Sequence, residues 1–179
     1  MGQKPRDLTP GIHHITVGAT AAEAYFLDEA DRFVWTRRFI RTLDRFGWTC
    51  VGFAQLKTHV HAIVETTDDS LGDGMHYLNM FYGKYFNEKN ERRGNLVRAR
   101  YWSKRSVDDA QLIAAFRYVA RNPMLAGLCA RPEDWFWSGF ATSCGLASTF
   151  PFVDASVVLA TLSATKTTAP SLLRALVRD

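Results

Sequence analysis

Hydrophobic and polar positions alternate most clearly in the segment Thr58–Glu65. Successive side chains of a β-strand point to opposite faces, so three small apolar residues of this segment share one face. The other face carries His59, His61 and Ile63. The pattern therefore predicts a strand that packs on helices through its apolar face and presents two histidines together on the other.

The rest of the chain divides into alternating and helically spaced segments. Strands are indicated by β-branched residues or alternation, and helices by apolar residues recurring every three or four positions. The order strand, helix, strand, strand, helix, strand, helix predicts an α+β fold, an antiparallel sheet with helices packed on it. Besides Thr58–Glu65, the predicted strands are 11–19, 48–56 and 95–106, and the predicted helices are 28–46, 71–87 and 108–121.

Size and composition indicate an ordinary globular protein. The 179 residues are 47% hydrophobic and 22% charged, which predicts one domain with a real core and short ends. We expect a flexible link at 161–170 and a short helix at 171–178. No run approaches eighteen apolar residues and the first ten are polar, so we expect neither a membrane span nor a signal peptide, and a cytoplasmic protein. The three widely spaced cysteines are expected to be free thiols.

Positive charge is concentrated in one part of the chain. The net charge is +4, but the segment Tyr82–Arg105 alone has eight basic residues against two acidic ones. Such a segment suits the phosphates of a nucleic acid, and Trp102 or Tyr101 could stack on unpaired bases. Alternating charge is also typical of any half-exposed strand. The DNA-binding candidates are Lys84, Arg92, Arg93, Arg98, Arg100, Trp102, Lys104 and Arg105.

His59 and His61 are candidate ligands of one divalent ion. Residues two apart on a strand have Cα atoms roughly 6 to 7 Å apart, so both rings can bind from the same side. The alternative is that both histidines merely lie on the solvent face. His13 and His14 are adjacent and point to opposite faces, so at most one can face this pair, and a surface or packing role is favoured for both.

Tyr118 and Asn122 fall on nearly the same face of the last predicted helix, and Pro123 places the asparagine at the helix end. If Asn122 adds an oxygen ligand to the two imidazoles, the mixed set is more acceptable for Mn²⁺ than for Mg²⁺. Such an ion can polarise a phosphodiester, and the phenol of Tyr118 can attack phosphorus. The alternative is a tyrosine that only packs at the helix edge.

Taken together, these motifs resemble the HUH single-strand DNA transposases with one catalytic tyrosine, the IS200-like family, and within it the branch associated with repetitive extragenic palindromes (REP). The resemblance covers about residues 11–145, leaving 146–179 as a partly flexible C-terminal extension. Two stretches depart from the family pattern: Leu56-Lys57-Thr58 replaces a usual Met-Pro-Asn, and Val97–Tyr101 departs from a usual aromatic-Gln-x-Arg-aromatic run. The resembling segments, in the family's order, are 11–19, 41–48, 58–65, 82–87, 116–128 and 132–138.

The resemblance implies a ferredoxin-like sheet, Mg²⁺ or Mn²⁺ bound by His59, His61 and Asn122, and Tyr118 as the nucleophile. It implies an enzyme that cleaves and rejoins single-stranded DNA near hairpins through a 5′-phosphotyrosine, acting as a monomer or a homodimer. Two other functions stay open. A domesticated relative would bind hairpin DNA without cutting it, and a metal-dependent phosphodiesterase would use water in place of Tyr118.

Overall fold

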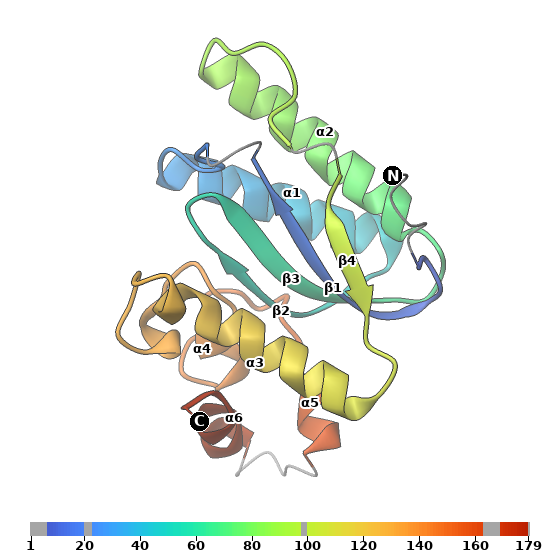
Figure 1. Ribbon diagram of the computed structural model, residues 1–179, viewed down its shortest axis with the longest axis vertical. Coiled ribbons are helices and arrows are strands. Elements are labelled where there is room, and N and C mark those ends of the chain that lie inside the picture. Colours follow the sequence, from blue (N-terminus) through green and yellow to red (C-terminus); the bar gives the residue numbers. More distant parts are fainter. Residues whose placement is uncertain (1–6, 20–22, 98–99, 163–168, 179) are drawn as a thin grey trace, which may run out of the picture.

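A four-stranded antiparallel sheet forms the centre of the protein, with strand order β2-β3-β1-β4 (Figure 1). The computed structural model describes residues 7–19, 23–97, 100–162 and 169–178. Helices lie on both sides of the sheet, which confirms the expected α+β, ferredoxin-like fold. The strands are β1 (Gly11–Gly18), β2 (Thr49–Gln55), β3 (His59–Thr66) and β4 (Trp102–Arg105), and the helices are α1 (Glu29–Phe46), α2 (Leu71–Lys89), α3 (Asp109–Leu125), the 3₁₀ turn η1 (Pro132–Asp134), α4 (Phe140–Ser143), α5 (Ser156–Thr161) and α6 (Ala169–Arg178).

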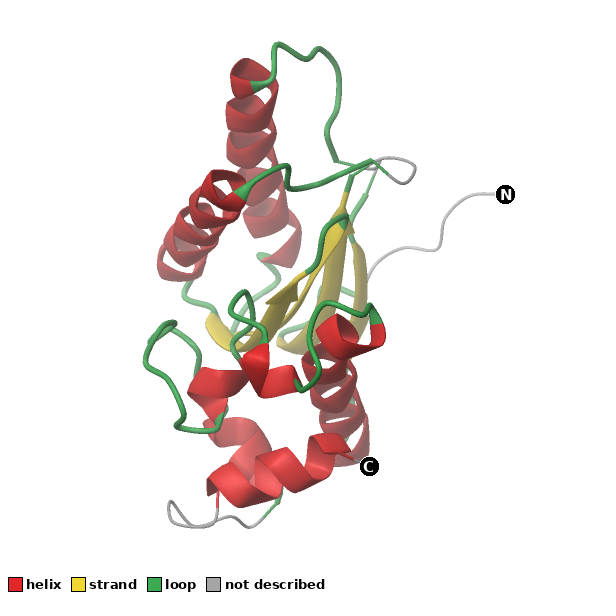
Figure 2. Cartoon of the chain, turned by 90° about the vertical axis from the view of Figure 1, so that its left-hand side faces the viewer, coloured by secondary structure: helices red, strands yellow, loops and turns green. Residues whose placement is uncertain are grey.

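The two faces of the sheet pack against different helices. Figures 1 and 2 show α1 and α2 on one side and α3 on the other. The α1–α2 side holds the larger core, which includes Ile15, Val60 and Ala62 of the central strands. The α3 side holds a second core, which includes Ile63 of β3 and Phe116 of α3. Alternation along β1 and β3 therefore sends one set of side chains to each core.

Helix α1 has the ends that its sequence predicts. Asp28 is the N-cap, its carboxylate accepts a hydrogen bond from the Asp31 backbone N–H, and the two residues form a reciprocal capping box. Gly47 ends the helix in the left-handed conformation, with φ 64°. Asp31 is fully buried, and Lys89 lies 2.7 Å from its Oδ1 and 2.6 Å from Oδ2 of Asp28. This ion pair network joins the start of α1 to the end of α2.

Two predicted boundaries are wrong. Helix α3 continues through Pro123 to Leu125, so Asn122 lies inside the helix and not at its end. A proline removes one helical hydrogen bond, but here the proline is buried, and the backbone N–H groups of Ala126 and Leu128 donate to the carbonyl oxygens of Asn122 and Pro123 and close the last turn. The predicted strand 95–106 is also too long, because among its described residues only Trp102–Arg105 form a ladder with β1, and Val97 makes an isolated bridge with Ala19. An alternating pattern indicates which side chains are buried. It does not indicate whether a neighbouring strand pairs with the segment.

The C-terminal segment packs on α3. Val158 of α5 and Leu173 and Val177 of α6 are buried in the α3-side core. The predicted link falls largely on 163–168, which lie outside the described residues, as do the first six residues. The cysteines are free thiols in the structure, two of them buried. Among the described residues, no helix combines the length and apolar character that crossing a membrane requires.

Alanine substitutions at two glycines of α2 should change the free energy of unfolding in opposite directions. A Cβ at Gly74 would lie 2.3 Å from the buried indole of Trp48, whereas a Cβ at Gly83 would meet nothing within 4 Å. We expect Gly74→Ala to lower the free energy of unfolding by about 1–3 kcal/mol through overpacking. Gly83→Ala should raise it by about 0.5–1 kcal/mol, since glycine is a poor helix former. Urea unfolding of both variants measures the difference, and equal effects would contradict it.

Candidate active site

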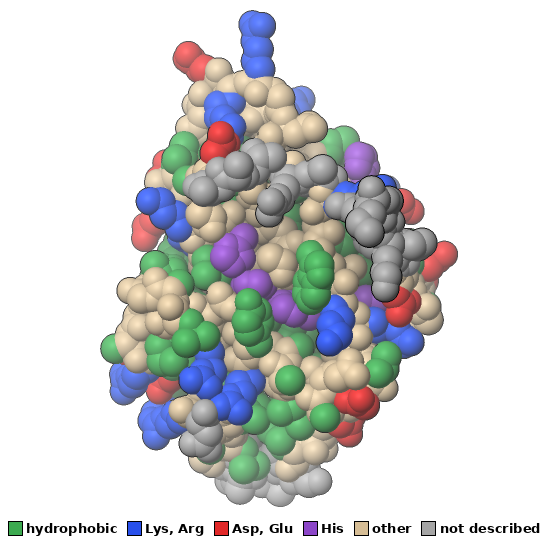
Figure 3. Space-filling view, in the orientation of Figure 1, with side chains coloured by type: hydrophobic (Ala, Val, Ile, Leu, Met, Phe, Trp, Pro, Cys, Tyr) green, Lys and Arg blue, Asp and Glu red, His purple; other side chains and the backbone are tan. Residues whose placement is uncertain are grey.

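The face of the sheet next to α3 carries the candidate site. The register pairs Thr16 with His61 and Gly18 with His59, and it pairs Thr16 with Trp102 on the other side of β1. Residues paired across an antiparallel ladder point to the same face, so His14, two residues from Thr16, joins them. Figure 3 shows histidine side chains gathered at the middle of this surface beside hydrophobic ones.

The two histidines of β3 face each other through their Nε2 atoms, which are 3.0 Å apart. Their other ring nitrogens are held by hydroxyls: Nδ1 of His59 lies 2.9 Å from Thr58 Oγ1, and Nδ1 of His61 lies 2.9 Å from Thr16 Oγ1. When Nδ1 carries the proton, each ring donates to its hydroxyl and keeps the Nε2 lone pair free. Hydrogen bonds of this kind orient metal-binding histidines.

This arrangement fits a divalent cation. Bonds of about 2.0–2.1 Å from one ion to two imidazoles place the two nitrogens about 3 Å apart, as His59 and His61 are. The part of the chain that the structure describes has no group of three or more His, Cys, Asp or Glu side chains able to hold a metal. Further ligands would have to be oxygens of another kind, such as an amide, water or a phosphate. Asn122, one turn after Tyr118 on α3, is the predicted amide.

Burial keeps these imidazoles neutral at pH 7. It lowers the pKa of His61 to about 3, helped by the neighbouring His59 and His14. It lowers the pKa of His14 to about 4, helped by Lys104, and it also lowers the pKa of His59. Neutral imidazole is the form that binds metals, so no proton has to leave the pair first.

Tyr118 stands beside the histidines. Its ring centroid lies 5.2 Å from that of His61 and 5.6 Å from that of His14, and 48% of the residue is exposed. The neighbouring residues Phe116 and Val119 are buried in the α3-side core, which fixes the rotation of the helix. The structure thus brings Tyr118, His59 and His61 together within one chain. It places Asn122 one turn further along the same side of α3.

His14 belongs to this group, contrary to the surface or packing role favoured from the sequence. Its Nε2 lies 3.1 Å from Nδ1 of His61. His13 points the other way, is fully buried and contacts the Thr9 carbonyl oxygen through Nε2 at 2.9 Å. The sequence limited the choice to at most one of the two. The register in which β1 pairs with β3 decides between His13 and His14. Alternation within β1 gives no information about that register.

Of the predicted DNA-binding residues, Trp102 and Lys104 share the face of the sheet with the histidines, because they pair with Thr16 and His14. Both are exposed on β4, and Trp102 meets the edge of the His14 ring at 5.2 Å. Arg93 and Arg100 are exposed and precede β4 in the chain. Arg98 lies outside the described residues.

Three of the predicted basic residues have acidic partners. Arg105 lies 3.0 Å from Asp7, Arg92 lies 2.7 Å from Glu23, and Lys84 lies 3.7 Å from Glu88 in an exposed pair. Part of the positive charge counted along the sequence is thus neutralised by carboxylates from other segments. The excess near β4 is smaller than the sequence indicates.

Comparison with known proteins bears on the fold. No protein-family model and no curated protein matches the sequence. A solved structure, that of a REP-associated tyrosine transposase bound to a REP hairpin, matches with a TM-score of 0.69 over 88% of this chain and 93% of that one, at 18% sequence identity. The chain has the fold of this transposase. At such low identity the likeness establishes the architecture, and it agrees with the family that the sequence motifs resemble.

The buried histidines should make stability depend on pH. The pKa of His14 in the folded protein is about 4, below its usual 6.5, so the unfolded chain binds more protons between these values. The free energy of unfolding should therefore fall by about 2 kcal/mol for this residue as pH drops from 7 to 5. Urea unfolding at both pH values, in the presence of a chelator, measures the change. His14→Gln should reduce the pH dependence, and an unchanged dependence would contradict this origin; His76→Gln, at an exposed position of α2, is the control.

Proposed function

We propose that this protein cleaves and rejoins single-stranded DNA next to hairpins, as a transposase-type strand transferase. The observation that carries the proposal is the exposed phenol of Tyr118 beside the His59–His61 pair. The fold it shares with a transposase bound to a REP hairpin supports the choice of DNA. Because the tyrosine and both histidines come from one chain, a single chain is the proposed catalytic unit.

Tyr118 is the nucleophile in this proposal. Its phenolic oxygen attacks the scissile phosphorus, the phenol proton leaves to solvent, and a bond from oxygen to phosphorus forms. The bond from phosphorus to the 3′-oxygen breaks, and that oxygen takes up a proton. The products are a 5′-phosphotyrosine and a free 3′-OH. Attack of a 3′-OH on the phosphotyrosine reverses the step and rejoins a strand, since the ester conserves the bond energy.

The histidine pair and Asn122 are the proposed ligands of Mg²⁺ or Mn²⁺, and the imidazole donors favour Mn²⁺. A bound ion would supply Lewis-acid polarisation of the scissile phosphate. Thr16 and Thr58 orient the two imidazoles through Nδ1. The proposed ligands include no carboxylate, so an ion held there would keep the positive charge that attracts a DNA phosphate.

Trp102 and Lys104 are proposed to position the strand. They share the face of the sheet with the histidines, so a base stacked on the indole lies next to the phosphate that Tyr118 attacks. Lys104 offers a positive charge to the backbone on the same side.

Covalent capture tests this proposal directly. The protein is incubated with Mn²⁺ or Mg²⁺ and hairpin oligonucleotides that carry single-stranded flanks, taken from palindromes beside its own gene, and denaturing gels report any adduct. We expect an adduct with the native protein, none with Tyr118→Phe, which lacks the nucleophile, and a loss of at least about 100-fold with His59→Ala.

Two results would contradict the strand-transferase function. Hairpin binding without adduct or cut product in either metal would leave a DNA-binding protein that does not cut. Cleavage that persists in Tyr118→Phe but not in His59→Ala would indicate a phosphodiesterase that uses water.

The hydroxyl of Thr16 provides a test of the metal site apart from cutting. Thr16→Val removes the partner of His61 Nδ1 with little change in side-chain volume. We expect Mn²⁺ affinity, measured by calorimetry, to fall by about 10- to 100-fold. Thr66→Val, at the far end of β3, is the matched control and should retain the affinity. Equal affinities for both variants would show that this hydroxyl does not orient a ligand.

A further inference from the structure

A groove of about 380 Å³ lies between α3 and α6, and Tyr118 is one of the residues that line it. Its apolar part is formed by Ile113 and Leu125 of α3 and by Leu176 of α6. Leu125 is 65% exposed, although it stands on a helix that packs against the sheet. The proposed nucleophile therefore borders a second surface, which comes from helices and not from the strands that carry the histidines.

Two arginines of α3, Arg117 and Arg121, also line this groove and are partly exposed. A helix turns by about 100° per residue, so the two lie about 40° apart on one stripe, and Tyr118 follows Arg121 by about 60°. Among the described residues, no carboxylate lies within 4 Å of either guanidinium. Figure 3 shows positively charged side chains over α3, below the histidines. Neither arginine is among the DNA-binding residues predicted from the sequence.

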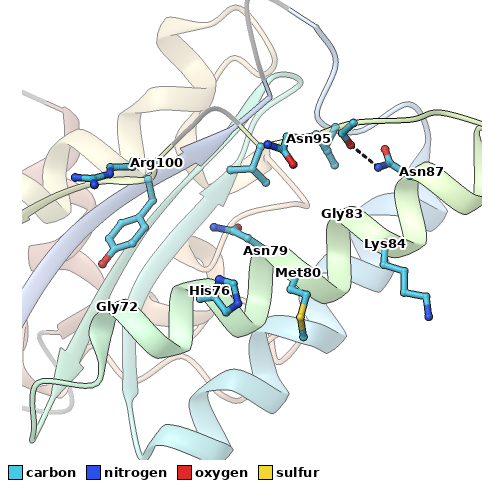
Figure 4. Close-up of a pocket in the computed structure, with 13 residues that line it drawn as sticks. Gly72, His76, Asn79, Met80, Gly83, Lys84, Asn87, Asn95 and Arg100 are labelled. Atoms are coloured by element: carbon cyan, nitrogen blue, oxygen red, sulfur yellow. Dashed lines mark hydrogen bonds between the residues drawn. The ribbon is translucent and has the colours of Figure 1, made fainter. Parts of the chain in front are cut away.

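The groove on α2 differs from this one. It lies between α2 and the segment before β4 (Figure 4), and α2 packs on the side of the sheet opposite to α3. Lys84 at its rim lies 3.7 Å from Glu88 and points away from the facing wall in Figure 4. Of these two grooves, the one between α3 and α6 is the one that Tyr118 borders.

A DNA strand suits the groove between α3 and α6 better than an apolar protein surface does. Under a protein partner, Arg117 and Arg121 would lose hydration without gaining an anion, which is unfavourable. Phosphates supply the anion and form charge-assisted hydrogen bonds with guanidinium groups. The two arginines are about 6 Å apart along the helix axis, a spacing similar to that of neighbouring phosphates in a stretched single strand. The apolar lining suits the sugar and base of the same nucleotide.

The geometry of the proposed reaction indicates which strand lies there. Attacking and leaving oxygens stand on opposite sides of phosphorus, so the strand that ends in the free 3′-OH departs on the side away from the phenol of Tyr118. The strand with the 5′-phosphate stays bonded to that phenol. Arg117 and Arg121 come from the same helix as Tyr118, whereas Trp102 and Lys104 come from β4.

We propose that Arg117 and Arg121 bind the backbone phosphates of the strand that becomes attached to Tyr118, with its first nucleotide in the groove between α3 and α6. Both are positioning residues, which hold the attached strand in place until a 3′-OH rejoins it. Because α6 forms one wall, the C-terminal extension takes part in binding the substrate. The choice of DNA, and of Tyr118 as nucleophile, rests on the proposed function.

Neutral phosphate analogues test this inference without any cutting. The probe is a short single-stranded oligonucleotide with a 5′-phosphate, equivalent to the attached strand, and a second probe has uncharged methylphosphonates at its first two linkages. Fluorescence anisotropy in the presence of a chelator measures the affinity for each. Arg117→Gln/Arg121→Gln removes both charges, and Arg117→Lys/Arg121→Lys keeps them. The matched control is Arg37→Gln/Arg41→Gln, which removes two exposed arginines of the same spacing from α1, on the other side of the sheet.

We expect the native protein to bind the charged probe about 10- to 100-fold more tightly than the neutral one. Arg117→Gln/Arg121→Gln should bind both probes equally, and its plot of log affinity against log salt should be less steep by about 1.4, which corresponds to two phosphates of a single strand. The lysine variant should keep most of the preference, and the α1 control and Tyr118→Phe should keep all of it. Melting temperatures near the native value show that the variants are folded.

Three results would overturn the proposal. The first is a native protein that binds both probes equally, or a preference that survives in Arg117→Gln/Arg121→Gln. The second is an equal loss in the Arg37→Gln/Arg41→Gln control, which would show that only net charge matters. The third is a native dimer that Leu125→Asp dissociates without changing the affinity for the charged probe, which would show that the groove holds a second copy of the chain.

The two proposals fail in different experiments. Loss of the phosphate preference contradicts the role of Arg117 and Arg121 and leaves covalent capture by Tyr118 unaffected. Absence of a covalent adduct contradicts the proposed function, whereas a phosphate preference that depends on the two arginines still assigns the groove to a DNA strand.

Discussion

The pairing of β1 with β3 is the constraint on which the candidate site depends. This register sets Thr16 opposite His61 and Gly18 opposite His59, so the hydroxyl that holds one imidazole comes from the neighbouring strand. Gly18 permits the close approach, because a Cβ there would lie 2.6 Å from the Thr58 carbonyl oxygen. A slip of one residue would turn the histidines toward the α1–α2 core and bring valines to the surface. The two apolar cores therefore fix the direction in which the histidines point as well as the fold.

Much of this arrangement follows from local patterns in the sequence. Alternation along β3 places both histidines on one face, and helical periodicity places Tyr118 at the edge of the buried stripe of α3. The caps Asp28 and Gly47 define α1 because they satisfy the helix ends within a few residues. These features were predictable since each depends on neighbours close in the chain.

Other features depend on partners that are distant in sequence. The inclusion of His14 follows from strand register, and the length of β4 follows from how many of its residues pair with β1. Arg105 and Arg92 looked available for DNA, yet their carboxylate partners Asp7 and Glu23 come from segments far along the chain. A count of charges along one segment cannot reveal such pairing. The continuation of α3 past Pro123 likewise depends on burial of the proline and not on its backbone preference.

The short length of β4 determines which parts of the chain can change in sequence without disturbing the sheet. Among the described residues of this segment, Trp102–Arg105 form a ladder with β1, and before them Val97 makes only an isolated bridge with Ala19. Substitutions before Trp102 need not disturb the pairing of β1 with β3 that holds the histidines. Over evolutionary time, this segment can therefore diverge between related copies while the strands that hold the histidine pair stay the same. Residues before the edge strand β4 are less constrained in sequence than the residues paired within the sheet.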